Sequence, residues 1–337
     1  MKYVLAVLAL GVLIIVHELG HFIMAKVNKV KVIEFTIGMG PKIFTYQGKE
    51  TKYCLSLFPV GGYVQMLGQG EESDDEASFT QKSAFRRFTI VIAGVVMNFI
   101  LAIILFTACI CHSGYITNDI KEINANGPAA QAGMEVGDTI TEVNGSKVLT
   151  YVDYSIESPG ANGEDIKLKV DRNGESKELT IKPELLEEEN RYIIGVTFDS
   201  IKEPTVLQGF KQSFKESGSL IMQTMKVFGR LITGRGNFAT DLGGPVTVIN
   251  LSAGAAEAGM WDLMNLVAIL SISLAVFNIL PIPALDGGWS VMLIIEMITR
   301  KKVPQKVTNV LNTIFFILLM LLVVAVTIKD ILYPISY

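Results

Sequence analysis

The stretch YVLAVLALGVLIIVHELGH, residues 3–21, decides the fold of this chain. It is uncharged and apolar until it ends in the motif His17-Glu18-Leu19-Gly20-His21. On a helix, two histidines four positions apart project from one face and both reach one Zn²⁺, while Glu18 lies beside the open position for water. A carboxylate and two imidazoles are costly in an apolar helix unless they are paired or bind a metal. We therefore interpret the motif as a metal-dependent hydrolase site inside a membrane.

The composition indicates a membrane protein with a soluble insert. Hydrophobic residues make up 50% of the 337 residues, and the mean hydropathy is +0.42, which is high for a soluble protein. The formal net charge of −4 gives no indication of a nucleic-acid partner. The three cysteines lack the paired spacing of a disulfide framework or a structural zinc site. A metal cluster at Cys109-Ile110-Cys111-His112 is an alternative, but it lies at the far end of a span from His17 and cannot complete that site.

Four stretches are long and apolar enough to cross a bilayer, which takes about 20 helical residues. They are residues 3–25, 88–111, 261–280 and 310–328. No small-residue cleavage site follows the first, so we expect a retained span rather than a signal peptide. Lysines and arginines gather near the membrane ends between the first two spans and between the last two, which predicts that both segments are cytoplasmic. The long segment 113–260 and both termini then lie outside.

Residues 31–67 carry β-branched and aromatic residues between glycine-rich turn signals, which predicts a small antiparallel sheet. Its apolar content favours a sheet that enters the membrane beside the catalytic helix, where irregular backbone must be covered by protein or line a cavity. The edge around Gly61, Gly62 and Tyr63 could then hold an extended substrate. A soluble cytoplasmic hairpin without a substrate role is the alternative.

The outer segment begins with a short helix and a glycine turn before a strand, in the stretch 127–145. Strand patterns follow at residues 166–170, 177–181 and 192–196, which predicts one small β-rich domain. Its part GDTITEVNG, residues 137–145, is similar to PDZ domains of the bacterial protease type, which bind peptides by adding a strand to a sheet edge. Peptide binding and a packed spacer that only excludes bulky substrates both stay open.

Residues 206–232 alternate apolar side chains with lysines and an arginine. The basic residues interrupt the apolar run, so an amphipathic helix on the outer membrane face fits better than a fifth span. We therefore expect this segment to lie on the bilayer surface.

A catalytic zinc site typically has three protein ligands and one open position, so the two histidines need a partner. Asp286 is the best candidate, in the stretch NILPIPALDGG, residues 278–288. Two prolines break the helix there, and two glycines free the backbone to bring the carboxylate close to a metal. Glu34 and Glu296 are competing ligands, but neither lies in an unusual motif. Asn98, in the second span, either assists the site or packs between helices.

Several further motifs accompany these residues, and together they make the chain resemble the site-2 protease family of intramembrane zinc metalloproteases. The likeness covers essentially the whole chain and is closest to the bacterial RseP type with one PDZ domain. The additional motifs are Gly38-Met39-Gly40-Pro41-Lys42, Pro59-Val60-Gly61-Gly62-Tyr63-Val64, Ala93-Gly94, Asn98-Phe99 and Gly243-Gly244-Pro245-Val246. Some relatives carry two PDZ domains, so gating by a paired module is not implied here.

The resemblance implies a zinc ion held by His17, His21 and Asp286, with Glu18 as general base. It also implies that Asn278 positions the substrate or its scissile carbonyl. The expected fold is a polytopic α-helical membrane protein with four transmembrane helices, a small membrane-associated β-sheet and an extracytoplasmic β-rich PDZ-like domain. We expect a membrane domain at 1–112, the PDZ-like domain at 113–200, an amphipathic surface region at 201–258 and a second membrane domain at 259–337.

These expectations predict a multi-pass endopeptidase of the bacterial cytoplasmic (inner) membrane. Its partners would be single-span membrane proteins, such as anti-sigma factors after a first cleavage or remnant signal peptides, and a peptide ligand for the PDZ-like domain. A transmembrane helix has closed backbone hydrogen bonds, so such a substrate must unwind before cleavage. An intramembrane metal transporter and a catalytically silent PDZ-bearing scaffold are the rival hypotheses.

Overall fold

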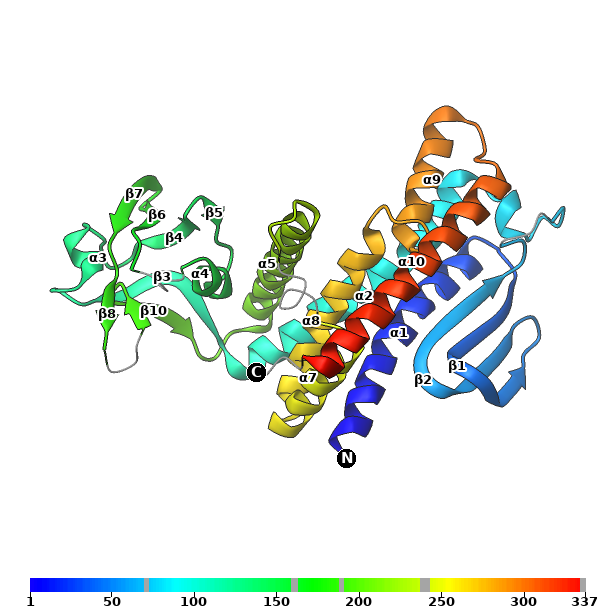
Figure 1. Cartoon of the computed structure of the whole chain (residues 1–337), viewed down its shortest axis with the longest axis horizontal. Coiled ribbons are helices and arrows are strands. Elements are labelled where there is room, and N and C mark those ends of the chain that lie inside the picture. The colour runs from blue at the N-terminus through cyan, green and yellow to red at the C-terminus, as the bar shows by residue number, and fades with distance from the viewer. Residues whose placement is uncertain (70–72, 159–162, 188–190, 237–242, 334–337) are drawn as a thin grey trace. The chain divides into compact units, whose positions relative to one another are not determined.

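The computed structural model describes residues 1–69, 73–158, 163–187, 191–236 and 243–333. The chain divides into two compact units. In Figure 1 their residues can be followed by the colour, which runs with residue number. We call residues 1–105 and 224–337 the helical unit and residues 106–223 the β-rich unit. The division into four domains expected from the sequence stays a prediction.

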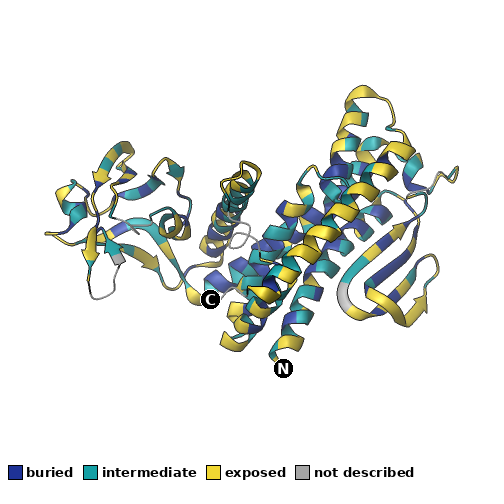
Figure 2. Cartoon of the chain, viewed as in Figure 1, coloured by how far each residue is buried: buried dark blue, intermediate teal, exposed yellow. Residues whose placement is uncertain are grey.

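The helical unit contains long apolar helices at all four expected spans. They are α1 (Lys2–Val27), α2 (Ala84–Ser113), α8 (Met260–Ile279) and α10 (Gln305–Leu332), and α2 continues into the β-rich unit. By length and composition each could cross a membrane, which confirms the four predicted spans. None of the most apolar window of α10 is buried in the protein, and Figure 2 shows the exposed residues along it. Contact with lipid explains why the apolar side chains of α10 are exposed.

The expected surface region at 201–258 contains two separate helices. The first is α5 (Val206–Ile232), at the predicted amphipathic segment, and the second is α7 (Pro245–Ala258). Helix α7 packs against α1, α8 and α10 and thus belongs to the helical unit. The buried Asp330 of α10 fixes the start of α7, because its carboxylate accepts a hydrogen bond of 2.9 Å from the backbone amide of Thr247.

The predicted small sheet is a long hairpin of β1 (Val32–Gln47) and β2 (Lys52–Met66), paired antiparallel. Strand β2 runs along α1, as Figure 1 shows. One apolar cluster joins the hairpin to α1, α2 and α9 (Asp286–Thr299). It contains Ala25, Val30, Val32, Phe35, Val64, Met66, Phe79, Ile90, Val91 and Leu293. The hairpin is therefore fixed against the helix that carries the histidine motif.

The β-rich unit is built on the strand order β10-β3-β4-β6-β7. These five strands are β3 (Tyr115–Ile123), β4 (Thr139–Val143), β6 (Ile166–Arg172), β7 (Glu175–Ile181) and β10 (Val196–Ile201). The short strand β5 (Ser146–Lys147) pairs with β4. A separate pair is formed by β8 (Glu184–Leu186) and β9 (Arg191–Ile193). Helix α3 (Pro128–Gln131) and helix α4 (Tyr151–Glu157) complete the fold. Its core includes Ile120, Ile140, Val143, Leu168, Val170 and Ile181.

The last strand predicted for this unit, at residues 192–196, is wrong as a single strand. The structure ends β9 at Ile193 and begins β10 at Val196, with Gly195 between them at φ 79°. A positive φ interrupts a strand, and glycine adopts it at little cost. The carbonyls around the break are used instead by Ala129 and Asn124, whose amides donate to Ile194 and Gly195 at 2.9 Å.

The first turns of α5 belong to the β-rich unit through a buried carboxylate. Asp153 of α4 accepts hydrogen bonds from the Ser219 hydroxyl at 2.6 Å and the Gln223 amide at 2.9 Å. Its second oxygen accepts from the amides of Leu149 and Thr150, which begins α4. Burial alone would raise the pKa of Asp153, but these hydrogen bonds hold it below the ordinary value. Polar contacts with Asp153 thus hold helix α5 to α4.

A buried ion pair makes the stability of the β-rich unit sensitive to acid. Asp138 is fully buried and accepts two hydrogen bonds of 2.7 Å from the guanidinium of Arg172. Burial alone would raise the pKa of Asp138, but Arg172 outweighs it and holds this pKa below the usual range. A lowered pKa in the folded state stabilises the unit above the unfolded pKa of about 4, and this stabilisation is lost as the pH falls through the folded value.

We expect Asp138→Asn to destabilise the β-rich unit by about 3 kcal/mol at pH 7, because Arg172 then loses its buried charged partner and keeps the exposed Glu135. The difference from the wild type should shrink below pH 4, where the wild-type carboxylate also takes up a proton. Hydrogen exchange of the β4 and β6 amides in the full-length protein, from pH 7 to pH 3, measures both effects. Asp199→Asn is the control, since Asp199 is exposed and its contact with Lys121 is 3.8 Å. Equal loss of protection in both variants would contradict the prediction.

Candidate metal centre

Three side chains predicted as metal ligands meet in the helical unit. The Nε2 atoms of His17 and His21 lie 3.1 and 3.3 Å from one carboxylate oxygen of Asp286, and 3.2 Å from each other. This Oδ2 is buried and has no well-formed hydrogen bond with any described residue. With zinc–nitrogen bonds of about 2.0–2.1 Å, a tetrahedral site requires ligand atoms about 3.3 Å apart. The three atoms therefore have the chemistry and spacing of three corners of a zinc site.

The start of α9 brings Asp286 to the two histidines. Helix α8 ends at Ile279, and a tight turn leads to Asp286, the first residue of α9. Gly287 and Gly288 leave no room for a side chain, because an added Cβ would lie 2.1 Å from the Leu280 carbonyl oxygen and 2.4 Å from that of Ile282. The glycines are thus needed for close packing of the turn on the helix. Backbone freedom, the reason expected from the sequence, is not what these positions require, because neither glycine has a positive φ.

A strained residue and a polar side chain of α10 hold this turn. Ala284 has φ 76°, in the left-handed region that non-glycine residues rarely adopt. Its amide donates a hydrogen bond of 3.1 Å to the side-chain oxygen of Asn312. Strain of this kind costs of order 1–3 kcal/mol and persists where the surrounding structure enforces it, often at functional sites. Asn312 therefore helps to set the position from which Asp286 enters the site.

Helix α2 covers the outer side of both imidazoles. The Nδ1 of His21 lies 2.9 Å from the Ile90 carbonyl oxygen, and the Nδ1 of His17 lies 3.2 Å from the amide nitrogen of Asn98. Between them, Gly94 faces the rings so closely that an added Cβ would lie 2.6 Å from an atom of each. Ile90, Gly94 and Asn98 thus lie on the one face of α2 that meets the two histidines of α1.

A cavity of about 240 Å³ adjoins the three converging side chains. Glu18 and Tyr63 line it together with His17, His21, Val64, Met66, Gln69, Phe79, Val91, Ala284, Asp286 and Trp289. Gly62 lies directly beside Glu18, since an added Cβ would be 3.3 Å from its Cγ. Strand β2 therefore forms one wall beside the predicted general base.

The two competing acidic ligands have other partners. Glu34 accepts hydrogen bonds from Tyr63 and Thr36 and pairs with Lys42. Burial alone would raise the pKa of Glu34, but these donors lower it to about 2. Glu296 of α9 pairs with Arg87 of α2, and both side chains are nearly buried. Neither carboxylate is grouped with the histidines in the described part of the chain, where His17, His21 and Asp286 form the one candidate metal cluster.

The other predicted site residues lie at varying positions. Tyr63 and Gly62 reach the cavity region, whereas Gly61, at φ 88°, packs against the side chain of Met39. Asn278 lies in the last turn of α8 and is half-buried. Cys111 packs near Gly209 of α5, and neither Cys109 nor Cys111 forms a disulfide bond within the described residues. The roles of Asn278, Gly61, Gly62 and Tyr63 in substrate binding stay predictions.

Apart from Asn98, the support that α2 and α10 give to the site was not predicted from the sequence. Asn312 carried a signal, because a polar side chain inside an apolar span indicates a specific partner. The Ile90 carbonyl carried none, since every residue has one. The Arg87–Glu296 pair depends on the way α2 and α9 pack, which no local pattern reveals.

Comparison with known proteins identifies the family. The sequence model of Peptidase family M50 matches residues 5–322 of this chain. The chain belongs to peptidase family M50. A protein of Clostridium acetobutylicum whose name describes a zinc metalloprotease is 44% identical over 334 residues, covering 99% of this chain and 98% of that protein. Zinc metalloprotease RasP of Geobacillus kaustophilus is 29% identical over 409 residues, covering 96% of each chain.

As a member of M50, this chain is a zinc metalloprotease of the site-2 type and a multi-pass membrane protein. Among solved structures, the PDZ domain of an SdrC-like protein from Listeria monocytogenes matches with 20% identity and a TM-score of 0.22. That match covers 26% of this chain and 87% of the other. The M50 chain has the four expected membrane helices, and its converging His17, His21 and Asp286 are the candidate zinc ligands.

Proposed function

We propose that this M50 peptidase cleaves single-span membrane proteins inside or near their transmembrane segments, with zinc held by His17, His21 and Asp286. The observation that carries the proposal is the meeting of these three side chains between apolar helices of spanning length. Substrates such as anti-sigma factors after a first cleavage, or remnant signal peptides, fit this chemistry. The lysines and arginines near the membrane ends support a cytoplasmic position for the site and an outer position for the β-rich unit.

The residues around the cavity fit peptide hydrolysis. A bound zinc ion lowers the pKa of a coordinated water to about 7 and polarises a carbonyl. Glu18 is placed to take a proton from water and to pass it to the leaving amine. The Glu34 carboxylate holds the Tyr63 hydroxyl, which fixes the ring at the cavity wall. Strand β2, with Gly62 beside Glu18, offers backbone against which an unwound substrate segment could extend.

Helix α5 supports contact of the β-rich unit with the bilayer. Its buried positions include Gln212, Ser213, Ser217 and Ser219, whereas Phe210 and Phe214 are exposed. A helix that buries serines and exposes aromatic rings has the reverse of a soluble pattern. Such an arrangement is typical of a helix whose apolar face enters the membrane interface.

A purified-protein assay tests the proposed activity. We expect the wild type in detergent to cut a tagged single-span protein, to stop when a chelator removes zinc, and to recover when zinc is restored. His17→Ala should lose both zinc and cleavage. His112→Ala is the matched control, because the remaining histidine of the chain lies at the end of α2, in the β-rich unit.

Cleavage that persists after zinc removal, or in His17→Ala, would overturn the proposal. Zinc flux into proteoliposomes without cleavage would favour a transporter. Full function of His17→Ala in cells would favour a scaffold.

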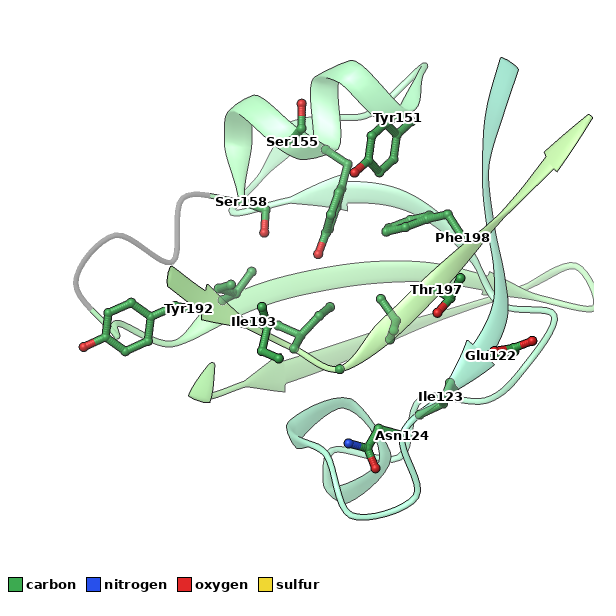
Figure 3. A pocket seen from close by; sticks show the side chains of 15 residues that line it. Glu122, Ile123, Asn124, Tyr151, Ser155, Ser158, Tyr192, Ile193, Thr197 and Phe198 are labelled. Atoms are coloured by element: carbon green, nitrogen blue, oxygen red, sulfur yellow. The ribbon is translucent and has the colours of Figure 1, made fainter. Parts of the chain in front are cut away.

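The β-rich unit also contains a groove that suits a peptide, shown in Figure 3. Its volume is about 590 Å³, and it lies between α4 and β10. Tyr151 and Tyr154 of α4 contact the ring of Phe198 on β10, with centroids 5.0 and 4.7 Å apart. Strand β10 ends the order of the sheet, so its outer edge is open to another strand in the described part of the chain. We infer that an extended peptide pairs with this edge.

A groove-filling variant separates peptide binding from a spacer role. Ser155 is exposed on α4 and lines the groove, so we expect Ser155→Trp to weaken binding of an apolar peptide by at least about 10-fold. Ile156→Trp, at the next position of α4 and outside the groove, should bind as the wild type does. Fluorescence anisotropy of a labelled peptide library with the full-length protein measures the affinities. Absence of binding to the wild type would support the spacer.

A further inference from the structure

We propose that Asn98 is a positioning residue that orients His17 for zinc by accepting a hydrogen bond from the Nδ1–H of His17. The proposal rests on the proposed zinc site and concerns a residue that touches neither the metal ligand atoms nor the cavity. Asn98 is fully buried on α2, and its side-chain nitrogen lies 3.2 Å from His17 Nδ1. Its side-chain oxygen is also buried and has no hydrogen-bond partner among the described residues.

The chemistry of a metal-bound imidazole decides which atom of the Asn98 amide faces His17. When Nε2 of His17 faces a metal, the neutral ring carries its proton on Nδ1, which becomes a hydrogen-bond donor. A donor needs an acceptor, and ligating histidines almost always have one at the second ring nitrogen. The two ends of an asparagine amide have nearly the same shape, so a half-turn of the Asn98 amide brings Oδ1 to Nδ1. The same turn gives a partner to the oxygen that otherwise has none.

His21 provides an internal comparison. Its Nδ1 lies 2.9 Å from the carbonyl oxygen of Ile90, which can only accept. The two histidines therefore have acceptors eight residues apart on one face of α2, one from the backbone and one from a side chain. The acceptor of His21 is fixed by the helix, whereas that of His17 can be removed by substitution. The backbone at Asn98 is itself held to α8, because Ser271 donates a hydrogen bond of 2.8 Å to its carbonyl oxygen.

A purely structural role would be packing between helices, the commoner role of a polar residue in a bundle. That role predicts contacts with a neighbouring helix other than the histidine helix. Within the described residues, the side chain of Asn98 has one hydrogen-bond partner, which is His17. The contact with α8 uses the backbone of Asn98, which any residue would supply. The side chain is therefore specific for the histidine.

Zinc affinity in two variants tests the proposal. We expect Asn98→Leu, which has no acceptor, to weaken zinc binding by roughly 10- to 100-fold, measured by competition with a chelator. Asn98→Asp keeps an acceptor and should bind zinc within a few-fold of the wild type. A packing role predicts the opposite order, because a buried charge is more disruptive than leucine. Asn265→Leu, at an exposed position of α8, is the control for the substitution itself.

Cobalt substitution adds a readout independent of activity, since its visible spectrum reports the geometry at the ligands. We expect an altered spectrum in Asn98→Leu and a nearly unchanged one in Asn98→Asp. If Asn98→Leu does not fold, as judged by circular dichroism, Asn98→Ala replaces it. Wild-type zinc affinity in a folded variant without an acceptor overturns the role of Asn98 alone, as does equal loss in the Asp and Leu variants. Absence of zinc from the wild type overturns the metal site as well.

Discussion

Glu18→Gln is expected to lower the rate of peptide cleavage by about 10²- to 10⁴-fold while the zinc content of the protein stays unchanged. Glutamine has nearly the shape of glutamate but cannot take up a proton from water. Glu18 is outside the group of three side chains that converge as metal ligands, although it lines the same cavity. The substitution therefore separates proton transfer from metal binding.

The measurement is the single-turnover cleavage rate of a tagged single-span substrate, with zinc quantified in the same preparations. Glu257→Gln is the matched control, because Glu257 is exposed on α7 and pairs with Lys2. We expect this control to cleave at the wild-type rate. Full activity in Glu18→Gln would remove Glu18 from the mechanism, and loss of zinc from this variant would show that Glu18 acts on the metal itself. A transporter would tolerate the change.

The spans and the ligand set could be predicted because each has a local signal. The apolar run of α1 and the spacing of His17 and His21 are properties of one helix, and Asp286 stands in a stretch whose prolines and glycines are unusual for a span. The comparison with known proteins confirms the family, and the structure brings the three side chains together. Periodicity and residue chemistry thus favour His17, His21 and Asp286, with Glu34 and Glu296 as competing ligands, and the family resemblance implies the same set.

The support around the site could not be predicted because it depends on the register between helices. Gly20 is an example, since an added Cβ would lie 2.4 Å from the carbonyl oxygen of Ala93. This contact sets how closely α1 and α2 approach, and neither sequence segment reveals its partner. The same holds for the Ile90 carbonyl at His21 and for Asn312 at Ala284. Gly195 shows that even a local feature can be missed. A glycine in a strand pattern indicates a break only when its φ is known, and here φ is 79°.

Gly94→Ala is expected to disrupt the metal centre, with at least about a 10²-fold loss of cleavage and a matching loss of bound zinc. The added methyl group would lie 2.6 Å from the His17 Cε1 and the His21 Nε2, well inside van der Waals contact. Both imidazoles, or α2 itself, would have to move. A shift of about 1 Å in a catalytic group is enough to lower the reaction rate by about 10²-fold.

The same substitution at Gly254 of α7 is the control, because an added Cβ there meets nothing within 4 Å. In a helix interior, Gly→Ala removes backbone freedom and stabilises by roughly 0.5–1 kcal/mol where space permits. We therefore expect Gly254→Ala to keep zinc and activity and to resist thermal unfolding slightly better. Zinc content, cleavage rate and melting temperature of the two variants are measured side by side. Normal zinc content in Gly94→Ala would mean that α2 does not confine the histidines, and the account of this helix as their outer wall would fail.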